Sequence, residues 1–289
     1  MPNTITLAKN YTSLLDEVYR TASVTADLTS DSAMSRAGAN ANEIIYPQIS
    51  VSGLGDYDRN SGYTTGAVDL KWKTAAFNYD RGTKISVDVM DNEESRNIAF
   101  SMAGATLIRE KVAPEADAFT FATLSALENI SKTTGTIADA SQFLDALLTA
   151  WSKMDEDEVP QENRILYATA TLLNSVMALD TTKSREILAK FTVKKVVPQA
   201  RFYTAIDLLD GKSGGEEAGH YKKADTGQEI NFMIVHKPAI IKFDKHTVSN
   251  IISASSNPDA DADIVKYRKY GIVDGYANKR AGIYLNSKA

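Results

Sequence analysis

Helical and irregular segments alternate at the start of the chain. Residues 8–22 carry Leu14, Leu15 and Val18 at three-to-four spacing, which predicts a short amphipathic helix. Residues 21–42 are rich in Ser, Thr, Ala, Asp and Asn and show no apolar periodicity. Because such a segment cannot bury enough apolar surface to become ordered alone, we expect either a flexible tail or an arm that orders against a partner.

The next segment alternates between apolar and polar positions, which predicts a β-ribbon. Its apolar positions in the two strands are Ile45, Ile49 and Val51, and then Val68, Leu70 and Trp72. Residues 52–62 lie between the strands and are rich in Gly, Asn and Asp, which favour loops. Because isolated two-stranded ribbons are marginally stable, we expect this ribbon to leave its own domain and lie on another surface.

A further strand precedes the longest predicted helix. Residues 77–91 keep the alternating pattern, and the period then changes to that of a helix running from about Asn92 towards Leu127. Asp91 is expected to cap this helix, and the acidic residues after it suit the N-terminal end of the helix dipole. Pro114 lies inside the helix and is expected to kink or divide it, because proline lacks a backbone donor.

The remainder of the chain mixes short helices and strands. Helices are predicted over 141–153, 169–179 and 184–191, strands over 165–168, 230–235, 239–243 and 265–285, and a Gly-rich mobile loop over 210–228. Because strands and helices are intermixed without regular βαβ alternation, the predicted fold class is α+β.

Composition narrows the classes of function. The chain has 289 residues with a net charge of −5, which argues against tight sequence-independent binding of nucleic acid. It contains no cysteine, so disulfides, thiolate catalysis and Cys-ligated metal sites are excluded. No apolar run approaches the length of a transmembrane helix, and the first residues do not resemble a secretory signal. We therefore expect a protein of the reducing cytosol, without membrane contact.

Two motifs resemble ligand-binding loops but are incomplete. Gly211-Lys-Ser213 resembles the end of a phosphate-binding P-loop, but Ile206 replaces the first glycine of that pattern. Asp259-Ala-Asp-Ala-Asp263 resembles the start of an EF-hand, but Ile264 and Tyr270 replace its glycine and its final glutamate. We interpret the first as a surface loop; the second is not an EF-hand, although a loose cation site there stays open.

Candidate catalytic groups are equally sparse. The acidic run 155–158 has no apolar or basic residue within it that would separate the pKa values of its carboxylates, so we interpret it as a solvated helix end. His220, His236 and His246 lack the spacing of a metal site and are interpreted as ordinary surface or interface residues. With no nucleophile elbow and no dinucleotide fingerprint either, we predict neither an enzyme nor a cofactor.

The order of these elements resembles one known family. An N-terminal arm, a long ribbon and a long helix occur in this order in the major capsid proteins of tailed bacteriophages, which have the Hong Kong-type coat fold. Residues 77–88 leading into 91–94 look like the return strand of that family's extended loop entering its spine helix, and 111–117 is similar to its helix segment around a proline. Residues 263–270 and 278–284 look like the closing strands of coat proteins from phages of Gram-positive hosts.

The resemblance implies a division of the chain. It implies an N-terminal arm over 1–45, an extended loop over 46–82, a peripheral domain with the spine helix over 83–130 and 237–289, and an axial domain over 131–236. It also implies a major capsid protein that self-assembles through pentamers and hexamers into the icosahedral shell enclosing double-stranded phage DNA, without sequence-specific DNA binding.

Further partners follow from the same resemblance. Family-like sequence begins near residue 40, so a separate scaffolding protein is expected, together with a portal. The protein would lie in the virion, and in the host cytoplasm during assembly. The alternatives are an encapsulin-like nanocompartment shell, which shares the fold and encloses protein cargo, and a hydrolase with an unrecognised site.

Candidate assembly contacts lie in the ribbon and at its junction with the long helix. They are Arg59, Trp72, Phe77, Arg81, Asp88, Glu93, Glu94 and Arg96. The charged members near the junction are expected to form ion pairs that set the angle of the loop, and Trp72, Phe77 and Tyr79 could pack on an adjacent subunit. Some family members crosslink a loop lysine to a neighbour's asparagine, but we interpret Lys71 and Lys73 as solvated strand residues that discourage stray edge pairing.

Overall fold

The computed structural model describes residues 22–30, 36–37, 43–94, 98–179 and 181–289. The helix expected over 8–22 and the candidate contact Arg96 therefore lie outside the described residues. The described chain divides into two units, one comprising residues 31–78 and the other comprising residues 1–30 together with 79–289.

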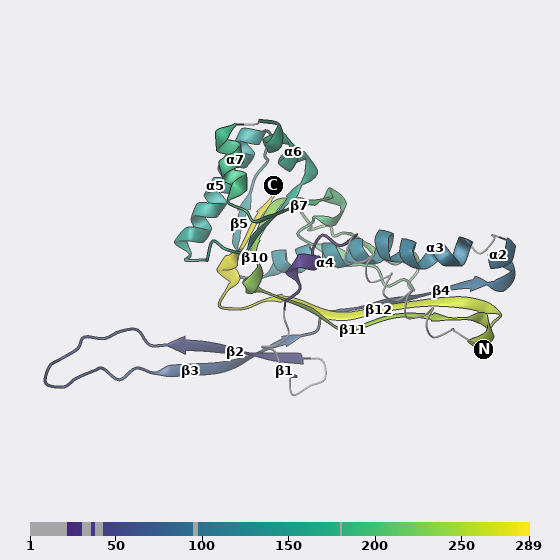
Figure 1. The fold of residues 1–289 in the computed structure, drawn as a ribbon, viewed down its shortest axis with the longest axis horizontal. Helices are drawn as coiled ribbons and strands as arrows, with labels where there is room; N and C mark the ends of the chain where they lie inside the picture. Colours follow the sequence, from purple (N-terminus) through teal and green to yellow (C-terminus); the bar gives the residue numbers. More distant parts are fainter. Residues whose placement is uncertain (1–21, 31–35, 38–42, 95–97, 180) are drawn as a thin grey trace. The chain divides into compact units, whose positions relative to one another are not determined.

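The smaller unit is the predicted ribbon. Strand β2 (Glu43–Val51) pairs antiparallel with β3 (Val68–Ala76), in a register that runs from Glu43 opposite Ala76 to Val51 opposite Val68. The two-residue strand β1 (Arg36–Ala37) pairs with β2. Within this unit, Figure 1 shows the long connection between β2 and β3 extending beyond the paired strands. The β-ribbon predicted from the alternating pattern is confirmed.

A three-stranded antiparallel sheet forms the first part of the larger unit. Its order is β11 (Ile240–Ile252), β12 (Ala262–Gly275) and β4 (Tyr79–Asp88), with β12 in the centre. The predicted strand before the long helix is thus confirmed as β4. Its neighbours come from the other end of the chain, in a register that places Lys266 opposite Lys84.

The long helical segment is divided into several elements. It consists of α2 (Val89–Glu94), α3 (Ile98–Leu107), a π-helical turn (Ile108–Val112) and α4 (Ala113–Ala126). Pro114 lies in the first turn of α4, directly after the π-helical turn, so the predicted kink or division takes the form of a π-helical turn just before this proline, with the chain helical on both sides. Proline has no N–H, and its ring clashes with the carbonyl group four residues earlier, which a wider turn can accommodate.

The start of this helical segment differs from the prediction. Helix α2 begins at Val89, and Asp88 Oδ1 accepts a hydrogen bond from the N–H group of Met90 at 2.9 Å. Asp91 lies within the first turn of α2, so the expectation that it caps the helix was wrong. Asp88 supplies the oxygen that a helix start requires.

A five-stranded sheet forms the second part of the larger unit. Its order is β5 (Ser131–Thr134), β13 (Ile283–Ser287), β10 (Ile230–His236), β6 (Arg164–Thr169) and β7 (Val193–Val197). Helices α5 (Ala140–Glu156), α6 (Ala170–Leu179) and α7 (Thr182–Ala189) contribute to the core on one face. Figure 1 shows these three helices gathered beside the sheet.

Strand β10 is the most deeply buried strand of this sheet. All seven of its residues are buried, because α5 to α7 cover one face of the sheet and α4 covers the other. Phe232 and Ile234 pack with Phe143 on the first face, whereas Met233 packs with Phe121 on the second. A strand covered on both faces loses the apolar–polar alternation and becomes a continuous apolar run.

Two segments differ from the predicted organisation. Strand β13 falls in the range 237–289 that was grouped with the spine helix, but it pairs with β10 and, in parallel, with β5 of the range 131–236. The Gly-rich segment expected as a loop over 210–228 contains strand β9 (Tyr221–Lys223), which pairs with β8 (Ile206–Leu208). No helix among the described residues is long and apolar enough to cross a membrane.

Candidate assembly surfaces and their anchors

The ribbon has one apolar face and one polar face. Because side chains alternate along a strand and opposite residues share a face, the register brings apolar side chains together on one face. That apolar face is made of Ile45, Pro47, Ile49 and Val51 from β2 and of Val68, Leu70, Trp72 and Thr74 from β3. The other face, called the polar face below, carries Gln48, Ser50, Asp69, Lys71 and Lys73, and at the end away from the tip it carries the buried Ile44, Tyr46 and Ala75.

Much of the apolar face is exposed to solvent. The exposed fractions are 61% for Ile49, 69% for Val51, 51% for Leu70 and 46% for Trp72. Exposed apolar patches of this kind mark sites of protein association. The ribbon therefore presents a surface whose burial against another surface would be favourable.

The ribbon tip is exposed as well. In the tip, Leu54 is fully exposed and Tyr57 contacts Tyr63 edge to face, with ring centroids 4.9 Å apart. Asp58 Oδ1 accepts hydrogen bonds from the N–H groups of Asn60 and Ser61, which shapes the turn and lowers the pKa of this carboxyl group. The candidate contact Arg59 lies in this turn and is exposed.

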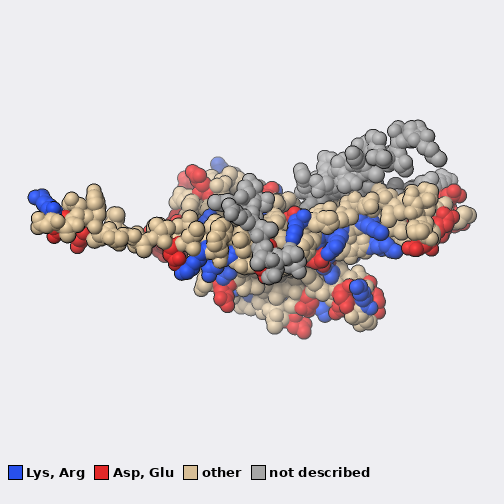
Figure 2. Space-filling model, turned by 90° about the horizontal axis from the view of Figure 1, so that it is seen from below, with Lys and Arg blue, Asp and Glu red and all other residues tan. Residues whose placement is uncertain are grey.

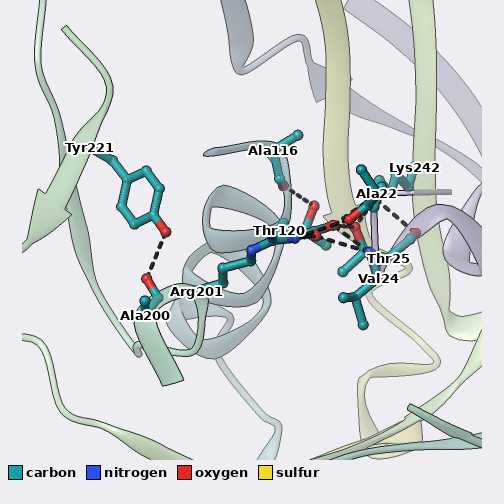
Figure 3. Close-up of polar contacts among 11 residues, drawn as sticks. Ala22, Val24, Thr25, Ala116, Thr120, Ala200, Arg201, Tyr221 and Lys242 are labelled. Atoms are coloured by element: carbon teal, nitrogen blue, oxygen red, sulfur yellow. Dashed lines mark hydrogen bonds and ion pairs between the residues drawn. The ribbon is translucent and has the colours of Figure 1, made fainter. Parts of the chain in front are cut away.

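A second feature anchors the segment 22–30 to the larger unit. Asp117 on α4 is completely buried. Its carboxylate accepts hydrogen bonds from Ser23 Oγ at 2.7 Å, from the Val24 N–H at 2.9 Å, and from both the N–H and the hydroxyl group of Thr25. In Figure 3, the side chain of Arg201 points toward Val24 and Thr25, and the dashed lines meet between them.

Two cations complete this anchor. Arg201 donates to Asp117 Oδ2 at 3.1 Å and to the Ala22 carbonyl at 3.0 Å. Lys242 on β11 donates from Nζ to the carbonyl oxygen of Thr25 at 2.9 Å and to its hydroxyl oxygen at 2.5 Å. Complete burial lowers the pKa of Lys242 to about 8, partly opposed by the nearby Asp117 charge. The anchor thus consists of buried charges satisfied by hydrogen bonds, as burial of charge requires.

A third feature joins β4, α4 and the loop after β8. Arg81 donates from Nε to Glu115 Oε1 at 2.7 Å and from its terminal nitrogen to the carbonyl of His220 at 3.3 Å. The hydroxyl of Tyr79 donates to the same Glu115 oxygen at 3.2 Å, and His220 Nδ1 lies 3.6 Å from the other oxygen. These residues line a cavity of about 300 Å³, together with Lys111, Asp210 and Tyr267.

The protonation state of Glu115 limits the chemistry of this cavity. Burial raises its pKa, but the neighbouring His220 and the Arg81 guanidinium outweigh this effect and hold the pKa below its ordinary value. A carboxyl group that stays ionised at neutral pH cannot act there as a general acid. The arrangement fixes the position of the loop after β8.

The predicted ion pairs at the ribbon–helix junction are wrong for Arg81. Its guanidinium binds Glu115 on α4, while Glu93 and Glu94 on α2 are exposed. Tyr79, expected to face an adjacent subunit, is buried and packs on Phe119 with ring centroids 4.9 Å apart. Alternation along β4 indicates which residues share a face of the strand, but it does not identify what covers that face.

The remaining candidate contacts are distributed along the junction. Trp72 is exposed on the ribbon, and Phe77 is half-buried. Asp88 is exposed and caps α2. Of the two ribbon lysines, Lys71 lies 2.5 Å from Asp69 in an exposed ion pair, and Lys73 is exposed.

The incomplete motifs have structural roles. Asp210 Oδ1 accepts hydrogen bonds from the N–H groups of Lys212 and Ser213, the backbone donors that a P-loop would offer to phosphate. These bonds, with that from the Ser213 hydroxyl as the largest contribution, lower the pKa of Asp210 to about 2. In the second motif, Asp263 Oδ1 accepts from the Ala254 N–H. In the part of the chain that the structure describes, no three His, Asp or Glu side chains are grouped to hold a metal ion.

The acidic run differs from its interpretation as a solvated helix end. Of the histidines, interpreted as surface or interface residues, His246 is exposed, His220 is half-buried and His236 is buried. Asp155 accepts a 2.6 Å hydrogen bond from Arg164, whose side chain is completely buried beneath Trp151. The acidic run is therefore not simply a solvated helix end. His236 is buried, and burial, followed by the charge of Arg164, lowers its pKa.

Sequence reasoning missed Asp117 and Glu115, the buried acidic residues at the centres of these two clusters. Glu115 and Asp117 lie in a segment of α4 that is otherwise almost entirely buried and uncharged. Acidic residues within a buried helical run indicate buried partners, because an isolated buried charge is very unfavourable. This signal was available, but the partners Ser23, Thr25, Arg201 and Lys242 are distant in sequence.

Comparison with known proteins identifies the fold. No protein-family model and no curated protein matches the sequence. Among solved structures, the chain is similar to one from Mycobacterium phage Che8, with 14% identity, a TM-score of 0.59 and coverage of 91% of this chain and 90% of that one.

Two further matches are described as capsids. For the capsid of cyanophage P-SCSP1u the identity is 12%, the TM-score is 0.56, and 88% of this chain and 85% of that one are covered. For the mature capsid of bacteriophage PhiM1 the identity is 13% and the TM-score is 0.57. The match covers 86% of this chain and 82% of that one. This chain therefore has the mixed α and β fold of phage capsid proteins, and the fold expected from the resemblance is confirmed.

Proposed function

We propose that this chain is a major capsid protein that self-assembles into the icosahedral shell enclosing phage DNA. The observation that carries the proposal is the fold, which matches phage capsid structures over nearly the whole length of both chains. A virion protein with a structural role, and without enzymatic activity, is the function that this fold supports best.

The exposed apolar face of the ribbon supports the proposal. We infer that it is covered in the shell by a second copy of the chain, since many equivalent weak contacts add up in a closed symmetric assembly. Arg59, Trp72, Phe77, Asp88, Glu93 and Glu94 are proposed to lie at such contacts. Arg81 is proposed to act indirectly, by holding β4 to Glu115.

The proposed boundaries of the arm, the extended loop and the two domains take the strand pairing into account. Residues 1–45 would form the arm and 46–82 the extended loop. Residues 83–130 and 237–282 would form the peripheral domain, and 131–236 with β13 the axial domain. The N-terminal arm would be held to its own subunit by the Asp117 anchor. A separate scaffolding protein and a portal are the further proposed partners, during assembly in the host cytoplasm.

Electron microscopy of the purified full-length protein tests this function. We expect closed shells, alone or on co-expression with the scaffolding protein encoded beside it. A protein that stays monomeric with its scaffolding protein would contradict the proposal. Shells from the native source that contain an enzyme instead of DNA would favour the encapsulin alternative, and hydrolysis in a broad activity screen would favour the enzyme alternative.

A further inference from the structure

The three-stranded sheet has a second face, opposite the long helical segment, on which several exposed charged side chains lie among the residues that the structure describes. Tyr267 of β12 packs on Ile108 of the π-helical turn, so its neighbours in the strand, Lys266 and Arg268, point to the opposite face. The residues that share this second face, called the open face below, are Asp80, Gly82, Lys84 and Ser86 from β4, Ile264, Lys266, Arg268 and Tyr270 from β12, and His246, Val248, Asn250 and Ile252 from β11. Ile264 is buried, whereas Lys84, Lys266 and Arg268 are exposed.

Two lysines face each other on this surface. Lys84 and Lys266 are directly opposite in the antiparallel register, and both are exposed. Directly opposite side chains lie about 5 Å apart at Cβ, and like charges in this position repel. Within the residues that the structure describes, neither ammonium group forms an ion pair.

A second pair of opposite cations on β4 and β12 differs from Lys84 and Lys266 in having carboxylate partners. Arg81 and Lys269 are also directly opposite, on the other face of the sheet. There each cation has its own carboxylate: Arg81 binds Glu115, and Lys269 lies 3.1 Å from Asp244. On the open face, Lys84 and Lys266 have no such carboxylate among the described residues, so their charges are available to an anion from outside the chain.

Further cations extend the pair into a patch. Arg268 lies two residues along β12 from Lys266, about 7 Å away, and is oriented by a bidentate contact with Asp80 at 2.9 and 2.7 Å. Lys245 reaches the same face, with Nζ 5.9 Å from the Tyr270 ring centroid. Figure 2 shows Lys and Arg side chains among the acidic ones on the side of the molecule seen from below.

We propose that the patch formed by Lys84, Lys266, Arg268 and Lys245 binds the phosphate backbone of double-stranded DNA without reading its sequence. The ammonium groups of Lys84, Lys266 and Lys245 can approach phosphates, which lie 3.4 Å apart along the axis of each strand, whereas Arg268 is already paired with Asp80 and contributes less. The net charge of −5 keeps this binding weak, and the phosphate contacts make it dependent on salt because each contact releases condensed counterions. The proposal takes from the proposed function only that the shell encloses DNA.

Fluorescence anisotropy with a labelled DNA duplex tests the patch. The full-length protein is compared with the double variant Lys84→Gln/Lys266→Gln between about 50 and 200 mM salt. Each lost phosphate contact reduces the slope of log affinity against log salt by about 0.9, so we expect a slope shallower by about 1.8. Over that fourfold range in salt, the wild-type affinity should fall by about 12-fold more than that of the variant.

The controls separate this site from a general effect of charge. Lys132→Gln/Lys237→Gln removes the same charge from two exposed lysines elsewhere and should keep the wild-type slope. Lys84→Arg/Lys266→Arg keeps the cations and should bind as the wild type does. Thermal melting should show that all three variants fold, because the substituted side chains are exposed.

Several outcomes would overturn the inference. One is the absence of DNA binding at low salt by protein that does form shells, which leaves the proposed function intact. Another is an equal change of slope in the Lys132/Lys237 control. A third is a Lys84→Gln/Lys266→Gln variant that keeps the wild-type salt dependence of DNA binding but self-associates less. This result would mean that the patch binds an acidic surface of a second copy of the chain.

Discussion

Asp117 and Thr25 make two hydrogen bonds, since Thr25 donates to the same Asp117 oxygen from its N–H at 3.1 Å and from its hydroxyl at 2.7 Å. The two residues are 92 positions apart in sequence. Through this contact, a helix of the larger unit holds the segment that follows the N-terminus, and the same hydroxyl accepts a hydrogen bond from the buried Lys242.

Replacing Asp117 by Asn should destabilise the subunit strongly. The change removes the charge that Arg201 pairs with and leaves several donors without their acceptor. Removing one partner of a buried charged pair costs about 3–5 kcal/mol in the free energy of unfolding, measured here by urea denaturation. Asp145→Asn, which removes an exposed ion pair with Lys183, should cost less than about 1 kcal/mol. Equal effects of the two changes would contradict a buried anchor.

The lowered pKa of Lys242 predicts a pH dependence. Its pKa is about 8 in the folded protein and 10.5 as an ordinary lysine. Between these values the unfolded chain binds more protons, so the free energy of unfolding rises with pH, by at most about 1.4 kcal/mol per pH unit. Urea denaturation from pH 7.5 to 9.5 should show this rise in the wild type and in Lys132→Met. The Lys242→Met variant should lack it.

The urea measurements stop at pH 9.5 because buried tyrosines change the pH dependence of stability above this value. Burial raises the pKa of Tyr221 to about 12 and also raises that of Tyr167. Near pH 10 the unfolded chain loses these tyrosine protons first, which lowers the free energy of unfolding as pH rises. A wild-type curve that is flat below this region and identical to that of Lys242→Met would exclude the assigned role of Lys242.

Glu115 should contribute a dependence in the acid range. Its folded-state pKa is lowered, so its stabilisation is present above the ordinary value of 4.5 and is lost as pH falls through the folded-state pKa. Glu115→Gln should reduce the free energy of unfolding by about 1.5–3 kcal/mol at pH 7, as expected for hydrogen bonds to a charged group. The difference from the wild type should shrink below pH 4.5.

A matched change on the surface provides the comparison for Glu115. Glu162 is exposed, and Glu162→Gln should leave both the stability and its pH dependence close to wild type. If the difference between wild type and Glu115→Gln stayed constant down to pH 2, the ion pair with Arg81 would not be what stabilises this site.

The two faces of the ribbon should respond differently to charge. Ile49→Glu places a carboxylate on the exposed apolar face, and Ser50→Glu places one on the polar face of the same strand. We expect Ile49→Glu to abolish or strongly reduce shell formation, judged by sedimentation and microscopy, because burying an unpaired charge at a contact is unfavourable. Ser50→Glu should assemble, and both should melt like the wild type. Normal shells from Ile49→Glu would exclude this face as a contact.

The ribbon tip should act in assembly and not in folding. Replacing residues 52–66 by a short Gly-Ser turn removes an exposed segment whose ordering without a partner is costly. We expect a soluble subunit that still melts cooperatively but forms few or no closed shells. An insoluble product would instead place the tip among the residues needed for folding, and normal shells would remove it from assembly.

Local patterns along the chain were sufficient for several elements. Alternation predicted β2, β3 and β4, and helical spacing predicted α5, α6 and α7, because the period of side-chain burial depends only on backbone conformation. The division of the long helix at Pro114 also followed locally, since proline cannot donate a hydrogen bond in any context. The start of α2 was placed wrongly because two acidic residues three positions apart, Asp88 and Asp91, are both suited to the capping position.

Pairing between distant residues could not be obtained in this way. The sequence indicates that Arg81 and Asp117 carry charge, but many oppositely charged groups are available to each, and only the folded chain selects Glu115 for Arg81 and Arg201 with Thr25 for Asp117. Likewise, the apolar pattern of β13 is compatible with either sheet, and its pairing with β10 and β5 depends on long-range packing. Periodicity encodes which side of an element is buried, whereas the partner that buries it is set by the free energy of the whole fold.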